Sequence, residues 1–203
     1  MLSKKLKIIY ILVLTAVALL GLIAFSSLEK HQEKAELSNN LNTQLGGDFS
    51  VPTADGQFNL IDYRGKVVLL YFGFASCPDV CPTALAMIGN ALKAMPKSAT
   101  DNIQPLFISV DPKRDDLKRL KTYGHYFHPS FLAGTTDRAN IDILVKQYGA
   151  FYSFHKLEDS AMEYSVDHSS RVYIINKEGQ LTDLISHADI LKDLPTQLLS
   201  LTN

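Results

Sequence analysis

The chain has 203 residues, of which 46% are hydrophobic, enough to bury the core of one globular domain. Its formal net charge is -1, and basic and acidic residues are spread through the chain. The basic excess that a phosphate-binding surface requires is missing, so we expect no nucleic-acid partner.

The first part of the sequence predicts a membrane anchor. Residues 1–7 include three lysines, and residues 8–25 carry no charged side chain. A helix over residues 8–25 spans about 27 Å, close to the hydrocarbon thickness of about 30 Å. Because the lysines precede the span, the positive-inside rule keeps residues 1–7 in the cytoplasm and exports the rest. We therefore predict a single-pass protein of the bacterial inner membrane with its C-terminal domain in the periplasm.

Two other targeting signals fit the N-terminus less well. A cleaved signal peptide would use Ala24 and Ser26 as a small-residue site, but the apolar run exceeds the usual length of about 7–15 residues. A mitochondrial presequence is rich in arginine, whereas the first arginine here is Arg64. The anchor is the preferred hypothesis, and cleavage of the segment stays open.

A polar linker is predicted before the folded domain. Residues 26–44 contain charges and asparagines without apolar periodicity, which is typical of a segment that separates a domain from a bilayer. We place the domain at residues 45–203. It opens with a predicted β-hairpin, because residues 49–51 and 58–60 alternate around an Asp-Gly turn.

The centre of the domain alternates strands and helices. Residues 66–74 are apolar at successive positions, which indicates a strand buried on both faces. A helix predicted at residues 83–95 and a second central strand at residues 106–110 complete a βαβ unit. The pattern then continues with a helix at 115–127, a short strand at 131–133 and a helix at 140–149. This alternation implies a parallel core.

The last part of the chain adds an antiparallel hairpin. Residues 171–176 and 181–185 alternate in polarity on either side of a turn, and a final amphipathic helix at residues 189–201 contains Pro195, which weakens or kinks it. A central strand, a cysteine motif leading into a helix, a βαβ unit, a hairpin and a last helix form the order of a thioredoxin-like fold. The expected class is therefore α/β, with a central mixed sheet flanked by helices.

Both cysteines of the chain, Cys77 and Cys81, lie in one proline-flanked hexapeptide between a strand and a helix. A disulfide between them would stabilise the fold little, because closing so short a loop removes little entropy from the unfolded chain. Pro82 suits the first helical position, so we expect Cys81 at the helix N-cap, where the macrodipole favours a thiolate. Two thiolates are soft ligands that select Cu(I) or zinc.

His168 is the candidate third ligand. It lies in the segment Tyr164–Ser170, which we predict as a polar turn before the strand at Arg171, facing the cysteine loop in a thioredoxin-like fold. Two thiolates and a neutral imidazole give Cu(I) an open, low-coordinate site, whereas zinc would require a fourth ligand. The alternative, an ordinary loop histidine, is weaker because of this position before the strand.

Four motifs follow one another along the domain: Phe72-Gly73-Phe74, the hexapeptide Cys77-Pro78-Asp79-Val80-Cys81-Pro82, Asp111-Pro112-Lys113-Arg114-Asp115 and Val166-Asp167-His168-Ser169. In type and order they resemble the Sco/SenC family of copper-binding assembly factors for cytochrome c oxidase.

This resemblance implies copper ligands at Cys77, Cys81 and His168 in a membrane-anchored, thioredoxin-like domain. The implied cargo is Cu(I), with Cu(II) left open, and the implied partner is the copper-receiving subunit of cytochrome c oxidase. Periplasmic copper carriers and thiol reductases are further candidate partners. The role of Asp111 stays open, since it either orients His168 or steers a partner, or simply forms the turn that begins a helix.

Two enzyme functions compete with the chaperone hypothesis. In a thiol-disulfide oxidoreductase, Cys77 and Cys81 would be catalytic, forming a reversible disulfide that acts on exported protein cysteines. Against this, three residues separate the cysteines where the usual redox motif has two, and the chain has no tryptophan. A peroxidase needs a threonine upstream of its cysteine, whereas Thr83 follows Cys81. We expect a metallochaperone, with accessory reductase activity as the alternative.

Overall fold

The computed structural model describes residues 45–158 and 162–202, with isolated positions at 21, 22, 25 and 32. Contacts divide the chain into Met1–Asn40 and Leu41–Asn203, and the fold below is that of the second unit.

The predicted tail at residues 1–7, the anchor at 8–25 and the linker at 26–44 lie outside the described residues, apart from those isolated positions. Within the part of the chain that is described, no helix combines the length and the apolar character needed to cross a bilayer.

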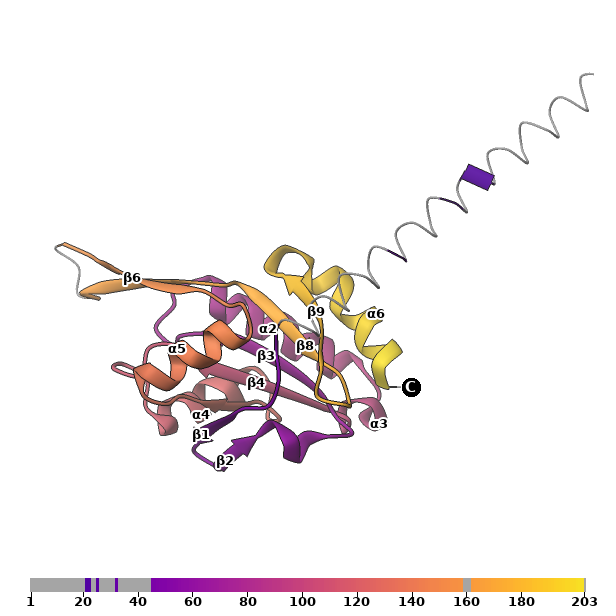
Figure 1. The fold of residues 1–203 in the computed structure, drawn as a ribbon, viewed down its shortest axis with the longest axis horizontal. Coiled ribbons are helices and arrows are strands. Elements are labelled where there is room, and N and C mark those ends of the chain that lie inside the picture. The colour runs from indigo at the N-terminus through magenta and orange to yellow at the C-terminus, as the bar shows by residue number, and fades with distance from the viewer. Residues whose placement is uncertain (1–20, 23–24, 26–31, 33–44, 159–161, 203) are drawn as a thin grey trace, which may run out of the picture. The chain divides into compact units, whose positions relative to one another are not determined.

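A seven-stranded mixed sheet forms the centre of the domain, in the order β2-β1-β5-β4-β3-β8-β9 (Figure 1). Its strands are β1 (Ser50–Thr53), β2 (Gly56–Asn59), β3 (Val67–Gly73), β4 (Ile103–Ser109), β5 (Leu132–Gly134), β8 (Arg171–Ile175) and β9 (Leu181–Ser186). Strands β3, β4 and β5 run parallel, while β8 and β9 join antiparallel beside β3. The predicted parallel core and the two predicted hairpins are confirmed.

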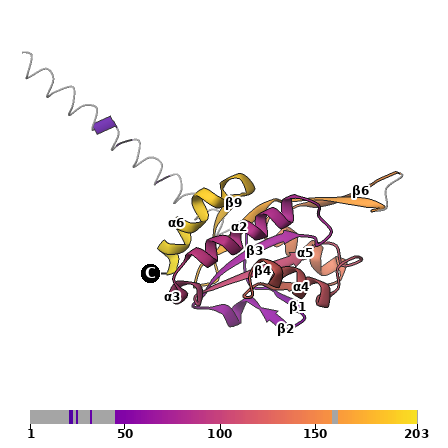
Figure 2. The same ribbon diagram turned by 180° about the vertical axis from the view of Figure 1, so that it is seen from behind.

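Helices cover both faces of this sheet, which is why every residue of β3 is buried. The helices are α2 (Val80–Ala94), α3 (Lys97–Thr100), α4 (Leu117–Phe127), α5 (Arg138–Gln147) and α6 (Ile190–Thr202), with short 3-10 turns at Leu60–Tyr63 and His187–Asp189. Helix α2 packs against α4 and α6 on one face, and α5 lies on the other (Figures 1 and 2). The expected α/β class with a central mixed sheet is thus confirmed.

A second, two-stranded sheet consists of β6 (Tyr152–Lys156) and β7 (Tyr164–His168), paired antiparallel. Figure 1 shows this hairpin extending beyond the main sheet. The prediction of a polar turn over Tyr164–Ser170 is therefore wrong, because only Ser169 and Ser170 connect β7 to β8. The missed signal is a period of two, with larger side chains at alternate positions of Tyr152–Lys156 and Tyr164–His168.

Candidate metal centre

The cysteine loop begins where β3 ends and closes on itself through the backbone. The Cys77 N–H donates to the carbonyl oxygen of Phe74 at 3.2 Å, and the Cys81 N–H points to Cys77 Sγ at 3.5 Å. The N-cap of α2 is Asp79, so the prediction of Cys81 as N-cap is wrong, and Cys81 lies in the first helical turn. Pro82 follows it there without loss, because first-turn N–H groups have no intrahelical acceptor.

A glycine behind the loop allows the buried sulfur to approach the sheet. A Cβ added at Gly73 would lie 2.7 Å from Cys81 Sγ and 2.9 Å from a ring carbon of Phe107. Only a residue without a side chain leaves this space, and Cys81 is consequently fully buried. Cys77, in the same loop, is only half-buried.

His168 is the last residue of β7 and contacts the cysteine loop, although it is far from that loop in the sequence. Its Nε2 lies 3.1 Å from Cys81 Sγ, and the ligand atoms of Cys77, Cys81 and His168 all lie within 4.8 Å of one another. The Nδ1 is 3.3 Å from the carbonyl oxygen of Ser169. One ring nitrogen therefore faces a backbone carbonyl oxygen, and the other faces the sulfurs.

Aromatic rings pack around the imidazole. The ring of His168 meets Phe74 edge-on at 5.8 Å between centroids and Tyr71 at 6.0 Å. These contacts leave the imidazole few orientations other than the one that faces the cysteines. Phe74 also precedes the cysteine loop, so it links the positions of both parts of the site.

The two thiols differ sharply in their proton affinity. A hydrogen bond from Cys81 lowers the pKa of Cys77 to about 3, with a further contribution from His168, even though partial burial opposes the shift. The hydrogen bond to Cys77 and burial raise the pKa of Cys81. The pair therefore holds one proton at neutral pH, with a thiolate on Cys77 and a thiol on Cys81.

A buried carboxylate holds the backbone segment that precedes Cys77. Asp115 accepts the backbone N–H of Ala75 at 2.8 Å and the hydroxyl of Ser109 at 2.6 Å. On the outer side of the loop, Arg119 donates to the Ser76 hydroxyl at 2.9 Å and lies 3.7 Å from the Asp115 carboxylate. Burial raises the pKa of Asp115. Asp115 closes the motif Asp111–Asp115, whose pattern in the sequence predicts no role for this residue.

Two other histidines of the domain, and Thr83, do not join the centre. Within the described ranges, Cys77, Cys81 and His168 are the group of thiol, imidazole and carboxylate ligands with metal-binding geometry. His128 contacts Ser130, and His155 lies 3.0 Å from the Asp167 carboxylate. The Thr83 hydroxyl donates to the Asp79 carbonyl oxygen at 2.9 Å, as part of the helix N-terminus.

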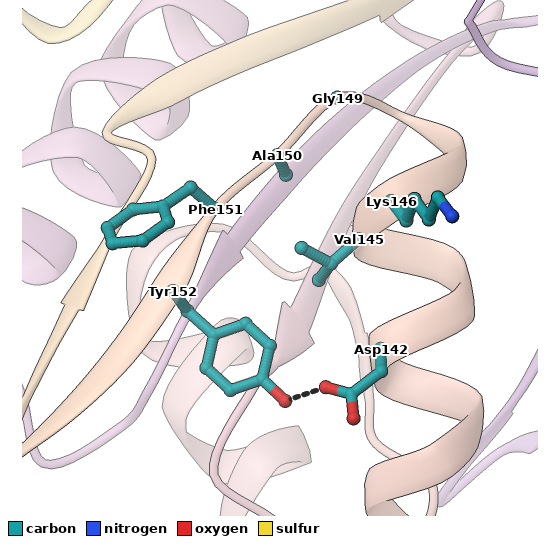
Figure 3. A pocket seen from close by; sticks show the side chains of 7 residues that line it. All are labelled: Asp142, Val145, Lys146, Gly149, Ala150, Phe151 and Tyr152. Atoms are coloured by element: carbon teal, nitrogen blue, oxygen red, sulfur yellow. Dashed lines mark hydrogen bonds between the residues drawn. The ribbon is translucent and has the colours of Figure 1, made fainter.

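A shallow hollow of about 330 Å³ lies between the end of α5 and the start of β6 (Figure 3). Its lining includes Lys146, Phe151 and the hydrogen-bonded pair Tyr152 and Asp142. Phe151 exchanges two hydrogen bonds of 2.8 Å with Ser169, the residue after His168. No thiol or imidazole lines this hollow, so it supplies no ligand of that kind for a soft metal ion.

Comparison with known proteins agrees with this arrangement. Residues 38–202 match the sequence profile of the family described as SCO1/SenC. The chain belongs to the SCO1/SenC family. The SCO2-like protein RP587 of Rickettsia prowazekii is 39% identical over 138 residues, which cover 68% of this chain and 67% of that relative.

Solved structures extend the similarity to the fold. Bradyrhizobium japonicum ScoI with copper bound superposes with a TM-score of 0.69 at 28% identity, covering 77% of this chain and 99% of that one. Yeast Sco1 with copper bound gives a TM-score of 0.69 at 33% identity, with 77% and 87% covered. The domain therefore has the thioredoxin-like fold of the SCO1/SenC family.

Proposed function

We propose that this member of the SCO1/SenC family is a copper chaperone that binds Cu(I) through Cys77, Cys81 and His168. The observation that carries the proposal is the convergence of two sulfurs and one imidazole nitrogen within 4.8 Å of one another, beyond the C-terminal end of the central strand β3. Two of the solved relatives described above hold copper.

The donor set suits Cu(I) better than the other common metals. Thiolates are soft ligands and select Cu(I) or zinc over magnesium, calcium and manganese. A structural zinc site needs four ligands, and the group here supplies three. Three ligands, one of them on a half-buried cysteine, give an ion that a partner's thiolates can remove by ligand exchange.

The place of action follows from the predicted anchor and belongs to the same proposal. A single-pass helix over residues 8–25 would hold the domain on the periplasmic side of the bacterial inner membrane. There the chaperone would deliver copper to the copper-receiving subunit of cytochrome c oxidase, or prepare the receiving site. Fusion of reporter enzymes after residue 44 tests the orientation, because a reporter active only in the periplasm must then be active.

A thiol-disulfide oxidoreductase is the second candidate function, and the asymmetry of the two thiols favours it. A half-buried thiolate on Cys77 can attack an external disulfide, while the buried Cys81 thiol lies beside it to resolve the mixed disulfide. The same two sulfurs would serve both functions. Oxidation to the disulfide removes both thiolate ligands and so prevents copper binding.

One experiment separates the two functions. The reduced full chain is titrated anaerobically with Cu(I) against a competing chelator, and the loaded protein is studied by X-ray absorption. We expect one tightly bound copper with two sulfur ligands and one nitrogen ligand. His168→Ala should remove the nitrogen ligand, and Cys77→Ser should abolish tight binding. Failure to compete with the chelator, together with intact disulfide exchange, would leave the oxidoreductase as the function.

A further inference from the structure

His168 lies on a strand that is not hydrogen-bonded into the seven-stranded sheet. Strand β7 pairs with β6 alone, and neither has a ladder partner in the seven-stranded sheet. The C-terminal end of β7 is tied covalently, because Ser169 and Ser170 lead directly into β8. The N-terminal end, at Tyr164, needs another attachment if the imidazole is to keep a fixed distance from the cysteines.

Three side chains provide that attachment, and we call them the clasp: Asp111, Arg114 and Tyr164. The Tyr164 hydroxyl donates to the Asp111 carboxylate, with distances of 2.8 and 3.1 Å to its two oxygens. The Arg114 Nε donates to the same carboxylate. Burial and the hydrogen bond to Asp111 raise the pKa of Tyr164 to about 12, so its hydroxyl remains a donor.

Arg114 also donates hydrogen bonds to the backbone at the start of β7. Its Nη1 donates to the carbonyl oxygens of Tyr164 at 3.1 Å and Met162 at 3.3 Å, and its guanidinium lies over the Tyr164 ring at 3.9 Å. The Asp111 side chain is fully buried and that of Arg114 is 18% exposed. Charge-assisted hydrogen bonds in so dry a place are stronger than those on a surface.

The clasp reaches the metal centre through Phe74. The guanidinium of Arg114 lies 5.5 Å from the Phe74 ring centre, on which the ring of His168 packs edge-on. Phe74 in turn supplies the carbonyl oxygen that accepts the Cys77 N–H. One arginine therefore contacts both the strand that carries the imidazole and the aromatic residue that begins the cysteine loop.

We propose that the clasp positions His168 for coordination, by fixing the N-terminal end of β7 to the loop after β4. Asp111, Arg114 and Tyr164 are positioning residues in this proposal, since none of them touches the metal ligands directly in the described contacts. The consequence for copper rests on the proposed function, whereas the effect on β7 itself does not. Without the clasp, β7 moves more freely and the imidazole spends less time within reach of Cu(I).

Tyr164→Phe is the most selective test, because it removes one hydroxyl and keeps the ring beneath Arg114. Arg114→Lys is a second variant, which retains the charge beside Asp111 but lacks the forked geometry that serves two acceptors at once. Lys113→Ala is the matched control, since Lys113 lies 5.5 Å over the Tyr164 ring and pairs with Glu163 but is outside the clasp.

Hydrogen exchange and Cu(I) binding, both measured on the full chain, test whether the clasp positions His168. Hydrogen exchange on the metal-free protein should show faster exchange at β7 in both clasp variants, with β3 unchanged as the reference for global folding. Losing a hydrogen bond to a buried carboxylate should weaken Cu(I) binding about tenfold, and X-ray absorption should show a diminished nitrogen ligand. The Lys113→Ala protein should behave as wild type in both.

Unchanged exchange at β7 together with a full nitrogen ligand in Tyr164→Phe would overturn the proposal. If β3 exchanges faster as well, Arg114→Lys supplies the decision under the same criteria. If the wild-type chain binds no Cu(I), the proposed function fails and the exchange data alone decide on the clasp. Faster exchange confined to β7 in the clasp variants then supports the role of the clasp, and unchanged exchange at β7 rejects that role.

Discussion

The pKa of the Cys77 thiol leads to a prediction about its alkylation. An ordinary cysteine has a pKa near 9, so its thiolate fraction, and with it the alkylation rate, falls about tenfold for each pH unit below that value. Between pH 8 and pH 5 the fall is about a thousandfold. Because the pKa of Cys77 is lowered to about 3, its thiolate stays fully populated over this range. We therefore expect a nearly flat rate profile from pH 8 to pH 5.

The assay is alkylation of the reduced, metal-free full chain with iodoacetamide, followed by mass spectrometry of the peptide that contains Cys77. The profile is more informative than the absolute rate, because a low-pKa thiolate is also a weaker nucleophile. The matched variant is Cys81→Ala, which removes the hydrogen bond that lowers the pKa most. It should shift the profile toward that of an ordinary thiol. A tenfold loss of rate per pH unit in the wild-type chain would refute the assigned charge distribution.

Three further predictions concern the same centre. Because the cysteine pair holds one proton at neutral pH, binding of Cu(I) should release one proton, measured by calorimetry in buffers of different ionisation enthalpy; release of two contradicts the assignment. Gly73→Ala should lower the unfolding free energy by about 1–3 kcal/mol in denaturant titrations, since its Cβ would overlap Cys81 and Phe107; an unchanged midpoint would refute the close packing. Asp115→Asn should speed hydrogen exchange at Ala75, because the charge that holds this N–H is lost; equal rates would show that the charge is dispensable.

The main sheet and its helices were predictable from local patterns. Residues 67–74 are all hydrophobic residues or glycine because both faces of β3 are covered, and this continuous run can be recognised without tertiary information. The hairpin of β8 and β9 carries its own turn residues in the same way. Helix α2 begins three residues earlier than predicted, at Val80 rather than Thr83, because proline is accommodated within the first turn as well as at its first position.

The candidate site was only partly predictable. Cys77 and Cys81 are four positions apart, so their proximity is a local property of the loop. The strand that carries His168 was missed, because the polar segment before Arg171 was interpreted as a turn. The contacts of the clasp could not be predicted from the sequence, because Tyr164 and Asp111 are separated by 53 positions and meet only in the folded protein.

The spacing of the three candidate ligands also links metal loading to folding. Cys77 and Cys81 remain neighbours in an unfolded chain, whereas His168 lies 87 positions beyond Cys81 and arrives only when the sheet is complete. An unfolded chain thus offers a two-sulfur chelate, and folding adds the nitrogen. Any ion that prefers three ligands stabilises the native state by that difference in affinity. Copper would then act as a ligand that selects folded molecules, and a newly made chain would reach full affinity only after the strand that carries His168 had assembled.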